Sequence, residues 1–157
     1  MLLTVLFASL AHATEVGTER KVGVGGEVGN GILGLTGKYW FSPTVGVSAG
    51  LGNFGTLQQL RLDFEMDIFT VRDEGFGRFD LFWLAGIDTG VYVLPGLASA
   101  RFGFGAGVGL DLKFHDAPVD AFVHAGLGVF PVEYCKTTTS LTCLLAPRGG
   151  VGARYYF

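Results

Sequence analysis

The chain has 157 residues, of which 49% are hydrophobic and only 16% are charged, and its mean hydropathy is +0.44. Soluble domains carry about 25% charged residues, so this composition is too apolar for an ordinary soluble domain. The net charge of -3 shows no basic footprint, which argues against a nucleic-acid partner. After the N-terminus no apolar run reaches the roughly 18 residues of a membrane helix. A β-barrel, in which alternation disperses the apolar residues, fits these limits.

The chain begins with MLLTVLFASLAHA, an apolar stretch that ends on small residues at Ala11 and Ala13. This pattern predicts a signal peptide at residues 1–13 that is cleaved after Ala13, so that the protein is exported. Residues 14–157 then form one barrel domain. The stretch has no Lys or Arg before its apolar core, and a buried first strand or helix is the alternative.

Period-two alternation of apolar and polar residues predicts eight strands. They span residues 21–28, 33–41, 45–52, 60–68, 79–89, 101–114, 119–129 and 148–157. The fourth is the clearest, because in LRLDFEMDI every second residue is apolar and the residues between are charged. Tight turns are expected at SPT, residues 42–44, and at HDAP, residues 115–118.

Eight consecutive apolar strands favour closure, because an open sheet would leave two adhesive edges. Because the strand number is even, we expect both termini on the same side of the barrel. We therefore expect an all-β fold: an eight-stranded antiparallel up-and-down transmembrane β-barrel.

The polar face of the strands decides whether the apolar face points outward, as in a membrane barrel, or inward, as in a soluble lipocalin-like carrier. That polar face is largely glycine, which solubilises little and weakens strands, so we expect it inside. There glycines would make room for Lys38, Trp40, Arg61, Arg101 and Arg154. Buried charges must be paired. The expected interior charge network consists of Arg61, Asp63, Glu65, Asp67, Arg101, Asp111, Asp120 and Arg154.

Aromatic residues are expected at the strand ends near the termini, where a membrane interface would place them. They are Tyr39, Phe41, Phe79, Phe114, Tyr155 and Phe157. In the final GVGARYYF, apolar residues alternate at Val151, Ala153, Tyr155 and Phe157.

This ending resembles the C-terminal signature of bacterial outer-membrane β-barrels. GLTGKYWFSPTVGVSAGLG and FHDAPVDAFVHAGLGVFP also resemble a family of small, uncharacterised eight-stranded outer-membrane proteins. The resemblance covers nearly the whole mature chain. It implies the outer membrane as compartment, the lipid bilayer and the barrel-assembly machinery as partners, and no catalytic residue to transfer. We expect a monomer.

Two stretches match the G-x-G-x-x-G pattern, at residues 29–34 and 50–55, but each lies between strands and lacks the following helix of a dinucleotide site. In the first stretch, the dipeptide Asn-Gly indicates a hairpin turn. We therefore expect no cofactor.

His124 is expected to face inward near Asp120. A lipid-modifying enzyme is one alternative function, but no Ser stands at strand spacing beside this His, and a satisfied interior His is the expectation. The scattered histidines predict no metal site.

Asp63, Glu65 and Asp67 share one strand face and could bind a cation. The preferred interpretation is that Arg61, Arg78 and Arg101 neutralise them across strands.

Cys135 and Cys143 are expected to form a disulfide in an oxidising compartment. They lie in the longest loop, residues 131–147, opposite the termini and hence outside the cell. That loop could bind a partner, or the disulfide could simply protect it from proteolysis. The expected function is that of a small, non-catalytic outer-membrane protein with a structural or surface-interaction role and no wide pore.

Overall fold

The computed structural model describes residues 16–29, 32–54, 57–94, 97–132 and 145–157. The expected signal peptide at residues 1–13 lies outside this part of the chain, and so do Cys135 and Cys143.

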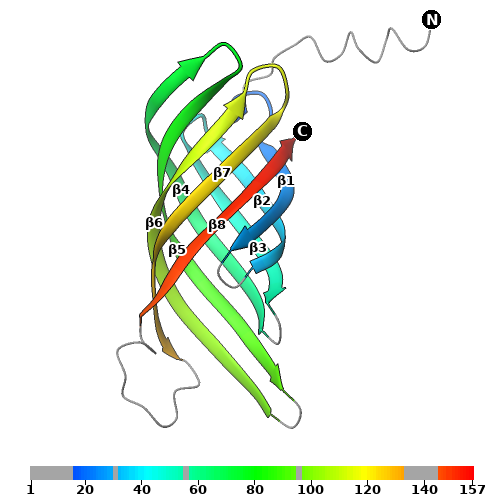
Figure 1. The fold of residues 1–157 in the computed structure, drawn as a ribbon, viewed down its shortest axis with the longest axis vertical. Helices are drawn as coiled ribbons and strands as arrows, with labels where there is room; N and C mark the ends of the chain where they lie inside the picture. The colour runs from blue at the N-terminus through cyan, green and yellow to red at the C-terminus, as the bar shows by residue number, and fades with distance from the viewer. Residues whose placement is uncertain (1–15, 30–31, 55–56, 95–96, 133–144) are drawn as a thin grey trace, which may run out of the picture.

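Eight antiparallel strands form one closed barrel, and each strand pairs with its neighbours in chain order. They are β1 (Val22–Gly29), β2 (Ile32–Ser42), β3 (Val45–Phe54), β4 (Leu57–Glu74), β5 (Gly77–Leu94), β6 (Leu97–Phe114), β7 (Val119–Val132) and β8 (Leu145–Tyr156). Pairing of β1 with β8 closes the barrel, and the strands run obliquely to its long axis (Figure 1). The predicted all-β, eight-stranded antiparallel up-and-down barrel is confirmed. Among the described residues no helix is both long and apolar enough to cross a membrane.

Three strands are much longer than the alternation predicts, since β4, β5 and β6 have 18 residues each. The predicted end of the fourth strand at Ile68 is wrong, because β4 continues to Glu74. Its register against β5 shifts between Asp67 and Phe69 and again between Thr70 and Arg72. Each such bulge adds a residue, which breaks the period-two pattern although the strand continues.

The apolar face of the strands points outward. On β1, Val22, Val24 and Val28 are exposed, whereas the intervening Gly23 and Glu27 are buried. The same alternation is seen on β4, where Leu60, Leu62 and Phe64 are exposed and the charged residues between them are buried.

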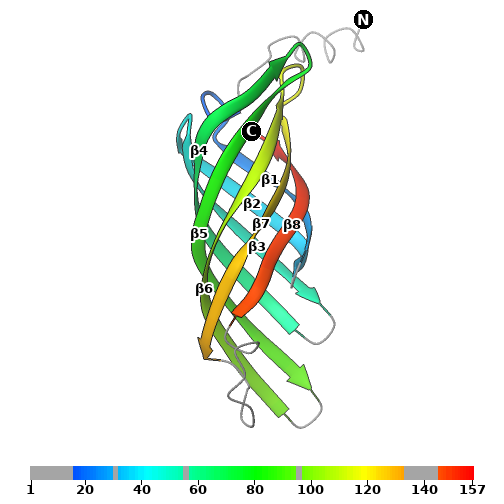
Figure 2. The same ribbon diagram turned by 60° about the vertical axis from the view of Figure 1, so that its left-hand side comes forward.

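The C-terminal residue and the start of β1 lie at the same end of the barrel, which we call the terminus end (Figure 2). Val16 packs there against Trp40 and Tyr156, and all three side chains are buried. Phe157 follows β8, and its backbone N–H donates to the Val22 carbonyl at 2.9 Å. The final residue thus continues the pairing that closes the barrel.

Candidate functional site

The outer surface of the barrel is a belt of apolar side chains. Exposed residues of this kind occur on every strand; examples are Leu35, Leu51, Leu62, Ile87, Val108, Val123 and Val151. In the described strands, outward positions with a charged side chain occur only at the terminus end of β4, at Arg72 and Glu74. An exposed apolar surface that surrounds the molecule is far larger than the patches of a soluble monomer.

One interior charge cluster is centred on Glu27 of β1. Arg61 of β4 donates to both carboxylate oxygens of Glu27, with each Nη–Oε distance 2.7 Å. Its Nε lies 2.7 Å from Asp63 Oδ2. Arg148 of β8 extends the cluster, because it contacts Asp63 at 2.8 Å and Asp88 at 2.9 Å. These ion pairs join β1, β4, β5 and β8 across the lumen.

A second charge cluster lies nearer the terminus end. Lys38 of β2 is 2.6 Å from Glu65 and 3.6 Å from Asp111. Lys113 of β6 contacts Asp67 at 2.5 Å and Asp80 at 2.9 Å.

Asp120 of β7 belongs to the same end of the lumen, where it accepts hydrogen bonds from Arg154 Nε at 3.1 Å and the Tyr156 hydroxyl at 2.6 Å. Every carboxylate of the predicted network therefore has a cationic partner, as burial requires.

Apolar side chains also pack in the lumen, beside the two charge clusters. Phe82, Leu84 and Phe122 pack together in the lumen and are buried. The Arg154 guanidinium lies 4.0 Å from the Phe122 ring centroid, while the His124 ring stacks on Phe122 with centroids 6.1 Å apart. Phe122 thus lies between Arg154 of the second charge cluster and His124, which is hydrogen-bonded to Glu27 of the first. Side chains fill this stretch of the interior, as expected for eight strands.

Inward glycines provide the space that these rings occupy. A Cβ added to Gly23 would lie 2.6 Å from the Tyr156 ring, and one added to Gly152 would lie 2.6 Å from the Phe122 ring. The sequence predicts room for Trp40 as well as for long cations, and the structure adds the Tyr156 and Phe122 rings to the side chains that the glycines accommodate.

The residues predicted as one network divide between the two clusters. Arg61 and Asp63 belong to the first, and Glu65, Asp67, Asp111, Asp120 and Arg154 belong to the second. The Arg101 guanidinium stacks on Phe130, 3.7 Å from the ring centroid.

The predicted neutralising partners of the β4 carboxylates need correction. Arg61 contacts Asp63 as expected, but Glu65 pairs with Lys38 and Asp67 pairs with Lys113. Arg78 contacts Asp80 instead. Spacing along one strand does not give the register between strands, which selects these partners. In the described part of the chain, no group of three or more His, Cys, Asp or Glu is arranged to hold a metal ion.

His124 faces inward, but its hydrogen-bond partner is Glu27 of β1 rather than Asp120, with the Nε2–Oε1 distance 3.0 Å. The imidazole is buried in the lumen between Glu27 and Phe122. It is therefore separated from the outer surface of the barrel by the strand that carries it.

The interior aromatic residues Phe82, Phe122, Phe130 and Tyr156 were missed by the sequence analysis. A usable signal was present for most of them. Phe122 has the same position parity as Asp120 and His124, and Tyr156 has the parity of Arg154, so strict alternation places these rings inside.

The residues of the C-terminal signature face outward. Val151, Ala153 and Tyr155 are exposed on β8, and Phe157 is exposed just beyond it. The rings of Tyr155 and Phe157 contact each other edge to face, as do those of Tyr39 and Phe41 on β2. These aromatic pairs lie at the terminus end.

Comparisons of the chain with protein-family models, with curated proteins and with solved structures found no match.

Proposed function

We propose that the chain is a small integral β-barrel protein of the bacterial outer membrane, with a structural or surface-interaction role and no catalytic activity. The observation that supports this most directly is the inside-out distribution of polarity. The outer belt is apolar on every strand, and the charges lie in the lumen as ion pairs. A barrel that spans a bilayer needs an apolar outer surface and must keep its charged side chains inside.

Export through a cleaved signal peptide and assembly by the barrel-assembly machinery belong to the same proposal. Val151, Ala153, Tyr155 and Phe157 present an apolar, outward face at the C-terminus, which is the face that such machinery would read. The barrel closes on itself through β1 and β8, so every strand pairs with a neighbour on each side within the barrel wall, which supports a monomer.

The buried side chains of Phe82, Leu84 and Phe122 pack together in the lumen, which supports the absence of a wide pore. The outward apolar face also favours a membrane protein over a soluble lipocalin-like carrier, whose apolar face would point inward. Burial of His124 beside Glu27 favours a structural role for that residue over lipid-modifying catalysis at the outer surface.

Expression of the full chain tests this proposal. The protein should appear in the outer-membrane fraction and should need detergent for extraction. On an SDS gel the unboiled sample should migrate differently from the boiled sample, because a closed barrel resists SDS until heated. A protein that stays in solution without detergent and shows no such shift would overturn the proposal.

A further inference from the structure

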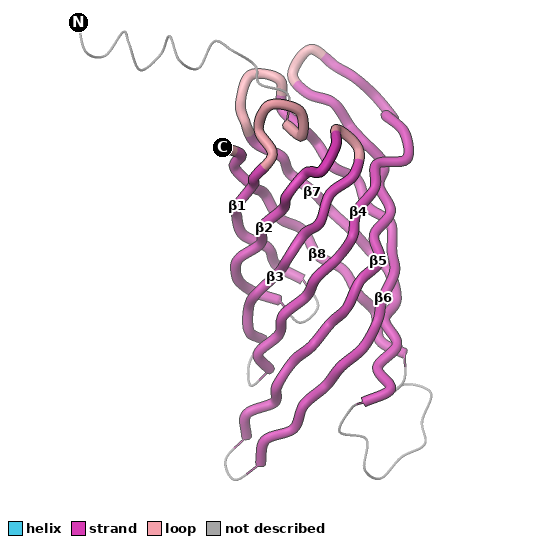
Figure 3. The backbone as a smooth tube through the Cα atoms, turned by 180° about the vertical axis from the view of Figure 1, so that it is seen from behind, coloured by secondary structure: helices cyan, strands magenta, loops and turns pink. Residues whose placement is uncertain are grey.

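The hairpin of β4 and β5 extends beyond its neighbour at the terminus end (Figure 3). The last residue of β4 that pairs with β3 is Met66, opposite Val45. Asp67 still donates its backbone N–H to the Thr44 carbonyl, and from Ile68 on β4 pairs with β5 alone, up to Glu74 opposite Gly77. The end of β4 therefore has a strand neighbour on one side only, whereas β5 pairs with β6 as far as Gly77 opposite Phe114.

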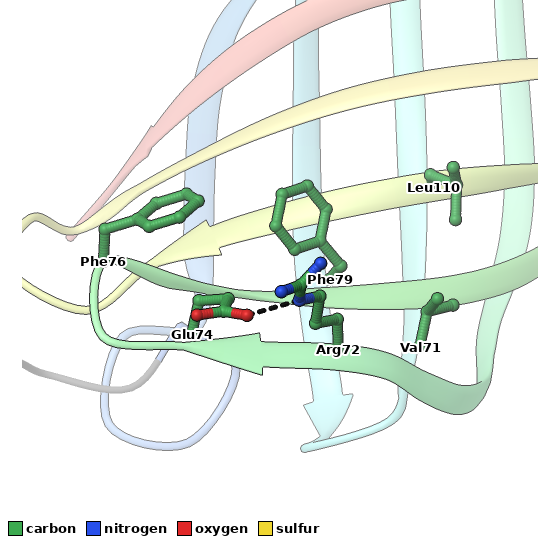
Figure 4. Close-up of a pocket in the computed structure, with 6 residues that line it drawn as sticks. All are labelled: Val71, Arg72, Glu74, Phe76, Phe79 and Leu110. Carbon is green, nitrogen blue, oxygen red and sulfur yellow. Dashed lines mark hydrogen bonds and ion pairs between the residues drawn. The ribbon is translucent and has the colours of Figure 1, made fainter.

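A groove of about 510 Å³ lies on the outer side of this hairpin. It is lined by Val71, Arg72, Glu74, Phe76, Phe79 and Leu110, which come from β4, the hairpin turn, β5 and β6 (Figure 4). Most of this lining is apolar, and the rings of Phe76 and Phe79 meet edge to face with centroids 6.0 Å apart.

The groove begins in the apolar belt and ends at a charged rim. Leu110 lies in the belt, where it pairs with Leu81 of β5 and Val123 of β7. Phe79 is two residues nearer the terminus end than Leu81, and Phe76 lies in the turn beyond it. Arg72 and Glu74 stand beside these aromatic rings (Figure 4). If the belt lies in lipid, as proposed above, this order matches that of a phospholipid from acyl chain to headgroup.

The rim offers one positive and one negative group side by side. Arg72 Nε donates to Glu74 Oε1, and the two side chains remain 71% and 39% exposed. This contact uses one edge of the guanidinium and one carboxylate oxygen. The Nη groups of Arg72 can therefore still donate to a phosphate, and the second Glu74 oxygen can accept from an ammonium.

We propose that this groove binds one phospholipid whose headgroup combines a phosphate with a primary amine, the chemistry of phosphatidylethanolamine. Its acyl chain lies against Phe79 and Leu110, its phosphate contacts Arg72, and its ammonium contacts Glu74. A choline headgroup fits less well because it has no N–H to donate, and a glycerol headgroup lacks the positive charge. The inference rests on the proposed membrane location.

The full-length protein, extracted in detergent, can be titrated by native mass spectrometry with phosphatidylethanolamine, phosphatidylcholine and phosphatidylglycerol of identical acyl chains. We expect the first lipid to bind about threefold to fivefold more tightly than the second, the range of one exposed ionic contact. Glu74→Gln should remove this preference. Arg72→Gln should weaken binding of all three lipids. Lys21→Gln, which removes an exposed cation outside the groove at the same end, should change nothing.

The gel shift on boiling, measured on the same preparation, distinguishes failure of the site from failure of the proposed function. A heat-shifting barrel that binds the three lipids equally, or keeps its preference in both groove variants, would overturn the lipid site alone. A soluble protein without the shift would overturn the membrane proposal, and the lipid site with it.

Discussion

Arg61 holds two carboxylates of the lumen at once, since it contacts Glu27 of β1 through both Nη groups and Asp63 of β4 through Nε. All three residues are buried. Arg61→Met should leave both carboxylates short of a partner, and removing one member of a buried ion pair costs about 3–5 kcal/mol. Urea unfolding of the barrel in lipid vesicles, followed by tryptophan fluorescence, measures the loss of free energy of unfolding.

Arg72→Met is the matched control for this prediction. Arg72 also forms an ion pair, with Glu74, but its side chain is 71% exposed. An exposed pair contributes about 0–1 kcal/mol, so this variant should unfold nearly as the unmodified protein does. Equal losses for the two variants would show that the Glu27 cluster contributes no more to stability than a surface pair.

At the scale of the element, β1 carries glycines on both faces and so offers a direct comparison. A Cβ on the inward Gly23 would lie 2.6 Å from the Tyr156 ring, which is buried and donates its hydroxyl to Asp120 at 2.6 Å. Because the ring is held in place, Gly23→Ala should destabilise the barrel by about 1–3 kcal/mol through overpacking. The same unfolding assay measures this change.

The outward Gly26 is the control on the same strand. A Cβ there would meet its nearest atom, the Gly34 carbonyl oxygen, at 3.7 Å, which is ordinary contact. Gly26→Ala should change the free energy of unfolding by no more than about 0.5 kcal/mol. If Gly23→Ala were equally neutral, inward glycines would not be required for packing of the lumen.

The strands show where reasoning from sequence succeeds and where it stops. Leu60 to Asp67 alternates strictly, and both the strand and its faces follow from that pattern. From Ile68 to Glu74 two bulges disrupt the alternation, so the overhanging end of β4 was missed together with the groove on it. A bulge depends on pairing with β5, which one strand's sequence does not reveal.

The contacts in the lumen show the same limit of prediction from one sequence. Charged residues identified the inward face correctly, because only a lumen could hold them in so apolar a chain. Their ion-pair partners depend on which strands face each other across the barrel. Lys38 of β2, for example, contacts Glu65 of β4 and Asp111 of β6. Closure brings such residues together, and nothing in their spacing along the chain specifies it.

For the whole molecule, the orientation of the two faces can be tested with the two tryptophans of the chain. Trp83 of β5 belongs to the outer belt and lies near Phe64, with ring centroids 5.6 Å apart. Trp40 of β2 is fully buried in the lumen, where the Lys38 and Lys113 amines lie 3.8 Å and 4.4 Å from its ring centroid. A bilayer around the barrel would therefore reach Trp83 and would be separated from Trp40 by the wall of strands.

Vesicles that contain phospholipid brominated on its acyl chains quench tryptophans in contact with lipid. Trp40→Phe leaves Trp83 as the emitter, and its fluorescence should fall strongly in brominated vesicles. Trp83→Phe leaves Trp40, whose fluorescence should change much less, and the gel shift on boiling shows whether each variant has folded. Strong quenching of Trp40 with little effect on Trp83 would mean that the faces are reversed. No quenching of either would mean that the outer belt does not contact lipid, because acyl chains at the belt must touch Trp83.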